Sequence, residues 1–289
     1  NKEGEMIMKT FPIHNQINLP EVGFGTYKIT EQSDMNEAVK AAKEAGYTYY
    51  DTAAFYGNER QLGQALKEAN IQRDEILIST KLWNKDQGKE NTKKAIKKTL
   101  KRLDTEYIDL YLIHWPCPES NLFIESYKVL EEYYEKGILK SIGVCNFTKE
   151  QLKKLMENTT ITPAVNQVEC HPYLNQHELQ AYCEQHGIHI MAWSPINRLR
   201  DIDQEEVMIE LSEKYNKSIA QIILKWHIER NRIVIPKSKT PSRIKDNIDL
   251  YDFELKEEEL KKIDDLNSDR RYGVHPNDFT IEDSDDTPE

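Results

Sequence analysis

The chain has 289 residues, of which 31% are charged, and its formal net charge is −11. This length allows one large α/β domain or two small ones, with a sizeable core in either case. The acidic balance disfavours a nucleic-acid partner unless a local basic patch overcomes the general repulsion.

The cysteine pattern and the hydropathy argue against a disulfide-rich protein and against a membrane protein. Cys117, Cys145, Cys170 and Cys183 form no C-x-x-C pair and are too few for a disulfide framework in a chain this long. No apolar run approaches the roughly 20 residues of a membrane span, so we expect no membrane contact. We therefore predict a cytoplasmic protein with reduced thiols. Residues 1–7 contain no signal-peptide core and are interpreted as a cloning remnant.

Between residues 8 and 280, short apolar runs alternate with amphipathic stretches of helical period. The expected strands are 21–26, 47–53, 76–82, 108–115, 139–147, 164–170, 189–195 and 232–238. The expected helices include 34–46, 59–70, 89–104, 125–137 and 148–158. Continuous apolar strands separated by helices indicate parallel pairing with right-handed crossovers. Eight such units predict an α/β fold of one domain, a closed (β/α)₈ TIM barrel.

The segments around these units complete the expected fold. Residues 15–20 suggest an N-terminal hairpin that caps the barrel floor, and 256–267 predicts an extra C-terminal helix. Residues 281–289 are acidic and poor in apolar side chains, so we expect disorder there. The main alternative is a doubly wound open sheet, which usually carries G-x-G-x-x-G between its first strand and a helix. Only Gly23-Phe24-Gly25 is present here, and the next helix begins several residues later.

The basic stretch 89–104 is the one candidate for a nucleic-acid contact. Its lysines surround Ile96, Leu100 and Leu103, which recur at i, i+4 and i+7. This spacing is typical of an amphipathic helix whose cations face water, so we predict no nucleic-acid partner.

Four polar residues stand at or just after the ends of three consecutive strands: Asp51, Tyr56, Lys81 and His114. In a parallel barrel, the carboxyl ends of the strands form the edge where chemistry occurs. A phenol is a weak acid unless a neighbour stabilises its phenolate, as an ammonium held by a carboxylate would. The imidazole is suited to orienting a carbonyl. The set therefore predicts a proton-transfer site, with Tyr56 as the acid.

The chain resembles the aldo-keto reductase superfamily over nearly its whole length. The motifs GFGTYK, DTAAFYGNE, STKLW, YLIHWP, IGVCNF, NQVECHPY, AWSP and IPKS…RIKDN follow one another in the order and spacing of that family. The likeness is greatest to the bacterial 2,5-diketo-D-gluconate reductase-like branch. It implies an NADP-dependent oxidoreductase that reduces small aldehydes, ketones or keto-sugars to alcohols. The hydride would come from nicotinamide C4 of NADPH and the proton from Tyr56, tuned by Lys81 and Asp51, with His114 positioning the carbonyl.

The same resemblance implies the binding residues. The cofactor would contact Gly25, Thr26, Asp51, Asn146, Gln167, Trp193, Ser194, Pro195, Ile196, Asn197, Lys237, Ser238, Lys239, Thr240, Arg243 and Asn247. Within this set, Lys237, Ser238 and Arg243 would hold the ribose 2′-phosphate, for which the Arg fork is well matched. The substrate would lie among Tyr27, Trp83, His114 and Trp115.

Three positions depart from the family pattern. Trp193 stands where relatives more often have Tyr, Cys145 where they usually have Ser, and Asp246 where they usually have Glu. A thiol is a weak hydrogen-bond donor, so Asn146 and Gln167 would carry more of the contact to the carboxamide.

Two other functions are compatible with a barrel fold, and the sequence argues against both. A non-catalytic nucleotide-binding protein of this fold would be expected to lack Tyr56, Lys81 or His114, and all three are present. A barrel hydrolase would use Asp51 and Glu59 as a carboxylate pair, but it leaves the Lys237/Arg243 cluster unexplained. The histidine pairs 186/189 and 171/177 lack a third ligand at a sensible spacing, so we predict no metal.

The physiological carbonyl is not encoded in these motifs. Substrate choice in this fold lies in the loops at the mouth and in the C-terminal segment. The loop at 197–206 is short, which favours an open site for small molecules, whereas residues 271–279 would either fold over the mouth or hang free. We expect a small-molecule carbonyl substrate and a monomeric protein.

Overall fold

The computed structural model describes residues 7–288. Residues 1–6 and 289 lie outside the described part, so the proposed remnant at 1–7 falls almost wholly beyond it; only Ile7 is described, and it is exposed. Eight parallel strands follow one another in sequence order around one sheet. They are β3 (Phe24–Gly25), β4 (Tyr49–Asp51), β5 (Leu77–Leu82), β6 (Leu110–Ile113), β7 (Ile142–Cys145), β8 (Val165–Glu169), β9 (His189–Trp193) and β10 (Ile233–Val234).

The two ends of this sheet meet and close the barrel. Parallel bridges join Val22 to Val234 and Gly25 to Lys237. At this seam the backbones lie so close that a Cβ on Gly25 would sit 2.6 Å from the carbonyl oxygen of Ile235. A side chain at position 25 would therefore force the seam apart. The predicted (β/α)₈ barrel is confirmed.

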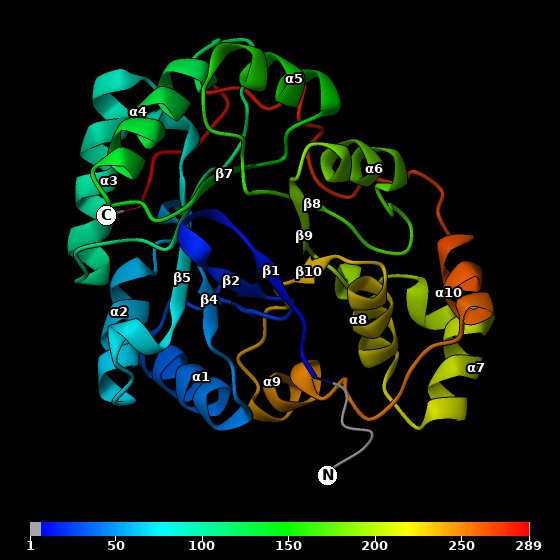
Figure 1. The fold of residues 1–289 in the computed structure, drawn as a ribbon. Helices are drawn as coiled ribbons and strands as arrows, with labels where there is room; N and C mark the ends of the chain where they lie inside the picture. Colours follow the sequence, from blue (N-terminus) through cyan, green and yellow to red (C-terminus); the bar gives the residue numbers. More distant parts are fainter. Residues whose placement is uncertain (1–6, 289) are drawn as a thin grey trace.

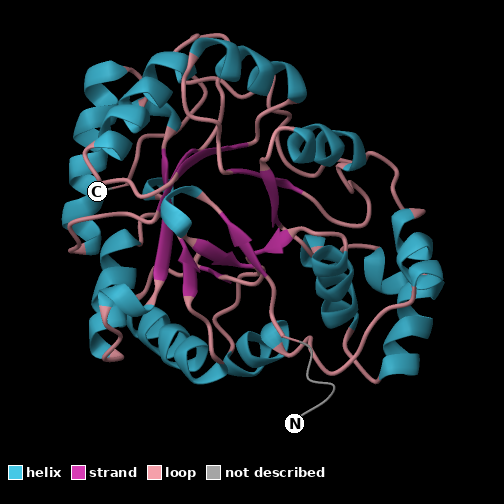
Figure 2. Cartoon of the chain, viewed as in Figure 1, coloured by secondary structure: helices cyan, strands magenta, loops and turns pink. Residues whose placement is uncertain are grey.

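Helices surround the strands as an outer ring (Figure 1, Figure 2). They are α1 (Gln32–Ala45), α2 (Glu59–Glu68), α3 (Lys89–Leu103), α4 (Phe123–Glu135), α5 (Lys149–Asn158), α6 (His177–Gln185), α7 (Glu206–Tyr215), α8 (Ile219–Glu229), α9 (Pro241–Ile248) and α10 (Glu257–Asp264). Most of them turn an apolar stripe toward the sheet, as α3 does with Ala95, Ile96 and Leu103, whereas α7 and α10 pack with α8 in a second apolar cluster. The basic stretch is thus the water-facing side of an ordinary barrel helix.

The N-terminal hairpin covers the barrel floor. Its strands, β1 (Thr10–Pro12) and β2 (Asn18–Pro20), pair antiparallel. His14 in the turn contacts Ser141 just ahead of β7, and His189 at the start of β9 contacts the carbonyl of Pro12. The hairpin therefore lies at the amino ends of the strands, opposite the mouth. The expected hairpin and the extra C-terminal helix, α10, are both present.

The two-residue period of the strands decides which side chains enter the barrel. Tyr49, Leu110, Leu112 and Met191 join one apolar cluster inside it, whereas Tyr111 belongs to the layer between strands and helices. Asp51 follows Tyr49 by two residues on the same inward face, so alternation alone aims its carboxylate into the barrel.

After α10 the chain returns to the mouth. It passes α6 and α5 and ends beside α3 (Figure 1). Residues 281–288, for which composition predicts disorder, instead lie against the loops after β4 and β5: the Trp83 indole N–H donates to the carbonyl of Asp285, and Ser284 is buried. Within residues 7–288, no helix has both the length and the apolar character to cross a bilayer.

Candidate active site

An ion pair lies at the centre of the mouth. Lys81 Nζ is 2.8 Å from Asp51 Oδ2, and both side chains are almost completely buried. The Lys81 ammonium also donates to the carbonyl of Thr52 at 2.7 Å. Burial disfavours the ammonium form, but the Asp51 carboxylate outweighs it and raises the pKa of Lys81 above its usual value. Lys81 is therefore a permanent cation at neutral pH.

Asp51 is held by groups from two further strands. Its Oδ1 accepts hydrogen bonds from Ser79 Oγ at 2.6 Å and from Gln167 Nε2 at 3.2 Å. Ser79 stands two residues before Lys81 in β5, on the same inward face, and pairs with Asp51 in the β4–β5 register. These bonds leave the carboxylate one orientation, with Oδ2 toward the ammonium.

Tyr56 lies in a short 3₁₀ turn (Ala54–Tyr56) directly after β4. Its hydroxyl is 3.5 Å from Lys81 Nζ. Burial raises the pKa of the Tyr56 phenol to about 12, Lys81 pulls it down, and Asp51 raises it. Lys81 thus lowers the pKa of Tyr56 as expected, but the opposite effect of burial is larger. The phenol carries its proton throughout the neutral range.

His114 follows β6 and faces the same space. Its ring centroid is 5.9 Å from that of Tyr56 and 5.1 Å from that of Trp83. Burial and the nearby Lys81 cation hold the pKa of His114 well below its usual value, so the imidazole is neutral. Its buried Nδ1 has no hydrogen-bond partner among the described residues. An N–H there would be left unsatisfied, which favours the tautomer with the proton on Nε2.

Asn146 and Trp193 contact each other beside this group. The Trp193 indole N–H donates to Asn146 Oδ1 at 2.8 Å, and Asn146 Nδ2 donates to the carbonyl of His114 at 2.9 Å. Asn146 adopts a left-handed backbone conformation (φ 61°), which Asn tolerates better than most residues. Cys145, the neighbour that departs from the family pattern, is packed in the apolar cluster inside the barrel. Its pKa is raised by burial, so it stays a thiol.

The residues predicted to bind the cofactor lie along the seam and the loops on either side of it. Gly25 ends β3 and Thr26 follows it; the Thr26 hydroxyl donates to the carbonyl of Asp51. The run from Ser194 to Asn197 follows β9. The Pro195 carbonyl accepts from His227, and Asn197 is fully buried, with no hydrogen-bond partner for its Nδ2 among residues 7–288.

The remaining predicted cofactor residues surround the start of α9. Lys237 is exposed overall, but partial desolvation of its ammonium, together with the nearby cations Lys239, Lys28 and Arg198, lowers its pKa. Arg243 is also exposed and makes no hydrogen bond or ion pair with the side chains or backbone of residues 7–288. Ser238, Thr240 and Asn247 adjoin these cations, and Thr240 N donates to Ser238 Oγ at 3.0 Å.

Aromatic side chains line the other side of the mouth. Trp83 stacks on Phe55, with ring centroids 3.7 Å apart, and Trp115 stacks on Phe279 at 4.9 Å. The four predicted substrate residues separate into two groups: Trp83, His114 and Trp115 contact one another, while Tyr27 contacts Tyr56 at 5.1 Å and is 44% exposed.

Sequence reasoning missed Ser79, Phe55 and Phe279. Ser79 was within reach, because it precedes Lys81 by two residues and must share its face. Phe279 was not, since nothing in its local pattern indicates which distant side chain it meets. Glu59, the second carboxylate of the hydrolase hypothesis, is bound to Arg102 at 2.8 Å and to Thr80, which faces away from the barrel interior. Asp51 and Glu59 therefore do not form a catalytic pair.

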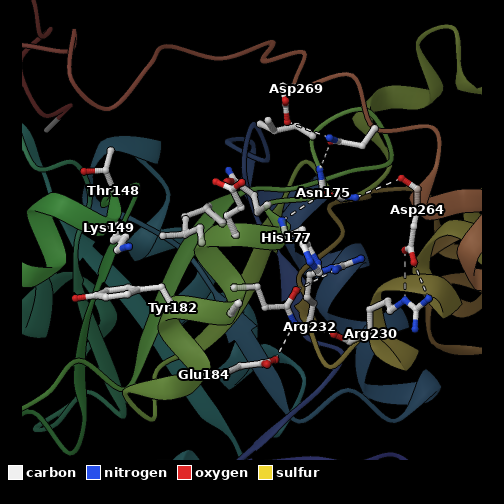
Figure 3. Close-up of a pocket in the computed structure, with 18 of the residues that line it drawn as sticks. Thr148, Lys149, Asn175, His177, Tyr182, Glu184, Arg230, Arg232, Asp264 and Asp269 are labelled. Atoms are coloured by element: carbon white, nitrogen blue, oxygen red, sulfur yellow. Dashed lines mark hydrogen bonds and ion pairs between the residues drawn. The ribbon is translucent and has the colours of Figure 1, made fainter.

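A groove of about 1490 Å³ runs along the flank of the barrel between α6, α10 and the chain leading to the mouth (Figure 3). Among its lining residues, Arg230 forms an ion pair with Asp264 at 2.6 Å. The predicted cofactor residue Asn146 lines it, whereas Asp51, Tyr56, Lys81 and His114 do not. His177 is on this wall, whereas His171 bonds to Glu169, and the described residues contain no cluster of three or more metal-ligating side chains.

Comparisons with known proteins agree on one family. Residues 21–268 match the Aldo/keto reductase family. The glyoxal reductase of Bacillus subtilis (strain 168) is 43% identical over 93% of this chain and 97% of its own. The methylglyoxal reductase DkgA of Escherichia coli (strain K12) is 40% identical over 90% and 94% of the two chains. Among solved structures, a Bombyx mori aldo-keto reductase in complex with NADP superposes with a TM-score of 0.85 at 34% identity, over 92% of this chain and 95% of that one.

Proposed function

The chain belongs to the aldo/keto reductase family, and from that premise we propose that Tyr56, Lys81, Asp51 and His114 carry its NADPH-dependent reduction of carbonyl compounds. The observation that carries the assignment is the position of Lys81, whose ammonium lies between the Asp51 carboxylate and the Tyr56 hydroxyl. The fixed cation stabilises negative charge on the phenol oxygen as its proton leaves for the carbonyl oxygen.

His114 has a different task in this scheme. A neutral imidazole with its proton on Nε2 donates a hydrogen bond to the carbonyl oxygen without competing with Tyr56 for the proton. The low pKa of His114 supports this role, because an imidazolium would be a rival acid. The two donors together hold the carbonyl in one orientation.

The residues at the seam fit NADPH. When bound, the cofactor supplies the hydride. The exposed cations Lys237, Lys239 and Arg243 have the charge that a 2′-phosphate needs, and the depressed pKa of Lys237 reflects partial burial and crowding by like charges. The unpartnered Asn197 Nδ2 is a buried donor suited to a pyrophosphate oxygen. Asn146 and Gln167 supply amides for the nicotinamide carboxamide, with Trp193 beside its ring.

We propose small carbonyl compounds as substrates, including α-dicarbonyls of the glyoxal and methylglyoxal type for which the relatives are named. The aromatic wall of Trp83 and Trp115 beside His114 supports a compact site of this kind. Uncharged keto-sugars are a second substrate class that the wider resemblance supports.

We further propose a cytoplasmic monomer. All four cysteines are free and buried, as expected for a chain that folds without disulfides. The exposed large apolar side chains of the described residues, Ile7, Tyr27, Ile209 and Val274, are scattered along the chain rather than clustered in sequence.

The test is a direct spectrophotometric assay that compares the wild type with Tyr56→Phe. Consumption of NADPH with methylglyoxal, followed by absorbance, should be rapid for the wild type and nearly absent for the variant. Equal turnover by both proteins would show that another group donates the proton.

A further inference from the structure

The chain after α10 forms a strap, residues 271–288, that is fixed at both ends of the mouth. Its first anchor is Glu169 at the end of β8, which accepts the backbone N–H groups of Tyr272 and Gly273 at 2.8 and 2.7 Å. His171 Nε2 contacts the same carboxylate at 2.8 Å. Although burial opposes it, these hydrogen bonds lower the pKa of Glu169, so the anchor stays ionised.

Gly273 brings this anchor into contact with the site. A Cβ at position 273 would lie 2.8 Å from the Trp193 ring and 2.9 Å from Glu169 Oε1. Glu169 and Trp193 are paired in the β8–β9 register. The strap therefore begins in direct contact with the aromatic side chain proposed to lie beside the nicotinamide.

The second anchor lies across the mouth, in the loop after β5. Trp83 Nε1 donates to the carbonyl of Asp285 at 2.7 Å, and Asn84 Nδ2 donates to Ser284 Oγ at 3.0 Å. Thr287 Oγ1 donates to Asp86 Oδ2 at 3.0 Å. Ser284 is only 5% exposed, so the strap is seated in this loop rather than resting on its surface.

Between its anchors the strap supplies part of the substrate wall. Phe279 stacks on Trp115 and meets Trp83 edge-on, with centroids 4.9 and 5.9 Å apart. Ile281 packs on the same aromatic cluster, and its backbone N–H donates to the Glu119 carboxylate. The strap thus packs on Trp83 and Trp115, the two aromatic side chains whose rings contact His114.

The closing part of the strap, residues 282–286, is acidic and contains no cation. Glu282, Asp283, Asp285 and Asp286 are all exposed, and the one ion pair recorded for them within residues 7–288 joins Asp286 to Lys85. The cofactor side of the mouth carries the opposite sign, with Lys28, Arg198, Lys237 and Lys239 in one neighbourhood. The mouth is therefore polarised, with cations where the nucleotide phosphates are proposed to bind and anions where the carbonyl enters.

We propose that the acidic run of the strap, from Glu282 to Asp286, selects uncharged small carbonyl compounds over carbonyl compounds bearing a carboxylate. The inference rests on the proposed function, because it concerns the substrate of the same site. An anionic substrate meets repulsion from the strap as it approaches, whereas a neutral one does not. Keto acids and sugar acids are accordingly poor substrates, and neutral α-dicarbonyls and aldehydes are good ones.

The experiment compares 4-carboxybenzaldehyde with 4-formylbenzamide, a pair that differs in charge and hardly in shape. The test variant carries Glu282→Gln, Asp283→Asn, Asp285→Asn and Asp286→Asn. It keeps the bond from Trp83, because that bond ends on a backbone carbonyl. The matched control removes four exposed charges from the outer helices α1, α2 and α5, by Glu37→Gln, Glu44→Gln, Glu68→Gln and Glu157→Gln.

The wild type and the control should prefer the amide, and the test variant should lose that preference by roughly threefold to tenfold in the ratio of kcat/KM values. The preference of the wild type should also shrink as salt screens the strap. An unchanged ratio in the test variant, or an equal shift in the control, overturns the charge selection.

Phe279→Ala tests the wall separately from the charge. It should raise KM for both aldehydes by a similar factor and leave NADPH binding, measured by fluorescence titration, as in the wild type. Unchanged KM values would show that Phe279 does not contact the substrate. If the wild type binds NADPH but reduces neither aldehyde nor methylglyoxal, the proposed function itself is wrong. If it reduces both aldehydes equally well, only the charge selection is wrong.

Discussion

Lys81 and Asp51 form a 2.8 Å ion pair from which water is almost entirely excluded, while the Tyr56 hydroxyl stands 3.5 Å from the same ammonium. Removing one charge of such a pair leaves the other buried without compensation. Asp51→Asn should therefore lower the free energy of unfolding by about 3–5 kcal/mol, as measured by urea denaturation. The double variant Asp51→Asn/Lys81→Met should lose less than Asp51→Asn alone. If the double variant is less stable than Asp51→Asn alone, the attraction within the pair exceeds the cost of burying its two charges.

Tyr56→Phe should reduce kcat for carbonyl reduction by roughly 10²–10⁴, the usual contribution of a general acid. NADPH affinity, measured by fluorescence quenching, should change little. Because the pKa of Tyr56 is about 12, the phenol is protonated at neutral pH. The kcat/KM for reduction should therefore be flat through neutral pH and fall only as pH rises toward that value. A fall beginning near pH 8 would identify a different acid or a lower phenol pKa.

Arg243→Ala should weaken NADPH far more than NADH, by about 10² in the ratio of dissociation constants, since a charge-assisted contact to phosphate contributes about 1.5–3 kcal/mol. Lys245→Ala, which removes another exposed cation of α9, is the matched control and should affect both nucleotides alike. Equal weakening by Arg243→Ala would place Arg243 at the adenine or at the start of α9 instead of the 2′-phosphate.

The buried neutral imidazole of His114 should make stability depend on acidity. Its folded-state pKa is well below the usual 6.5, so below that pH the unfolded chain binds a proton that the folded chain does not. Stability is therefore full above about pH 6.5 and falls as pH drops, by about 1.4 kcal/mol per such group at about pH 5.5. His114→Gln should flatten this dependence in urea denaturation at several pH values. His227, whose pKa is lowered by burial and by Arg232, contributes in the same direction and would remain.

The barrel and the central site were accessible from sequence because both follow from local patterns. Alternation places Asp51 and Lys81 inside the barrel, and consecutive parallel strands bring their ends together. The net direction of the Tyr56 pKa was not accessible, since it depends on how completely the surrounding side chains exclude water. The contact from Trp193 to Asn146 depends on how two loop side chains meet, which no periodicity encodes.

The C-terminal segment 281–289 shows most clearly what composition alone does not predict. Its acidic composition predicts a free tail, yet the described residues 281–288 contact the loops after β4 and β5. Two of these contacts use backbone carbonyl and hydroxyl groups, which a composition rule does not weigh. An acidic exposed edge and a seated backbone are compatible, because the carboxylates point to water while the chain between them is bound.

The floor hairpin and the strap place the two ends of the described chain on opposite faces of the barrel. Thr10 begins the hairpin at the closed end, while Pro288 lies beside Gly57 at the open one. For an immobilised biocatalyst this asymmetry decides the orientation on a support. Attachment through the hairpin side would leave the mouth facing the solution, whereas a tether joined next to Pro288 would draw the strap and the entrance toward the surface.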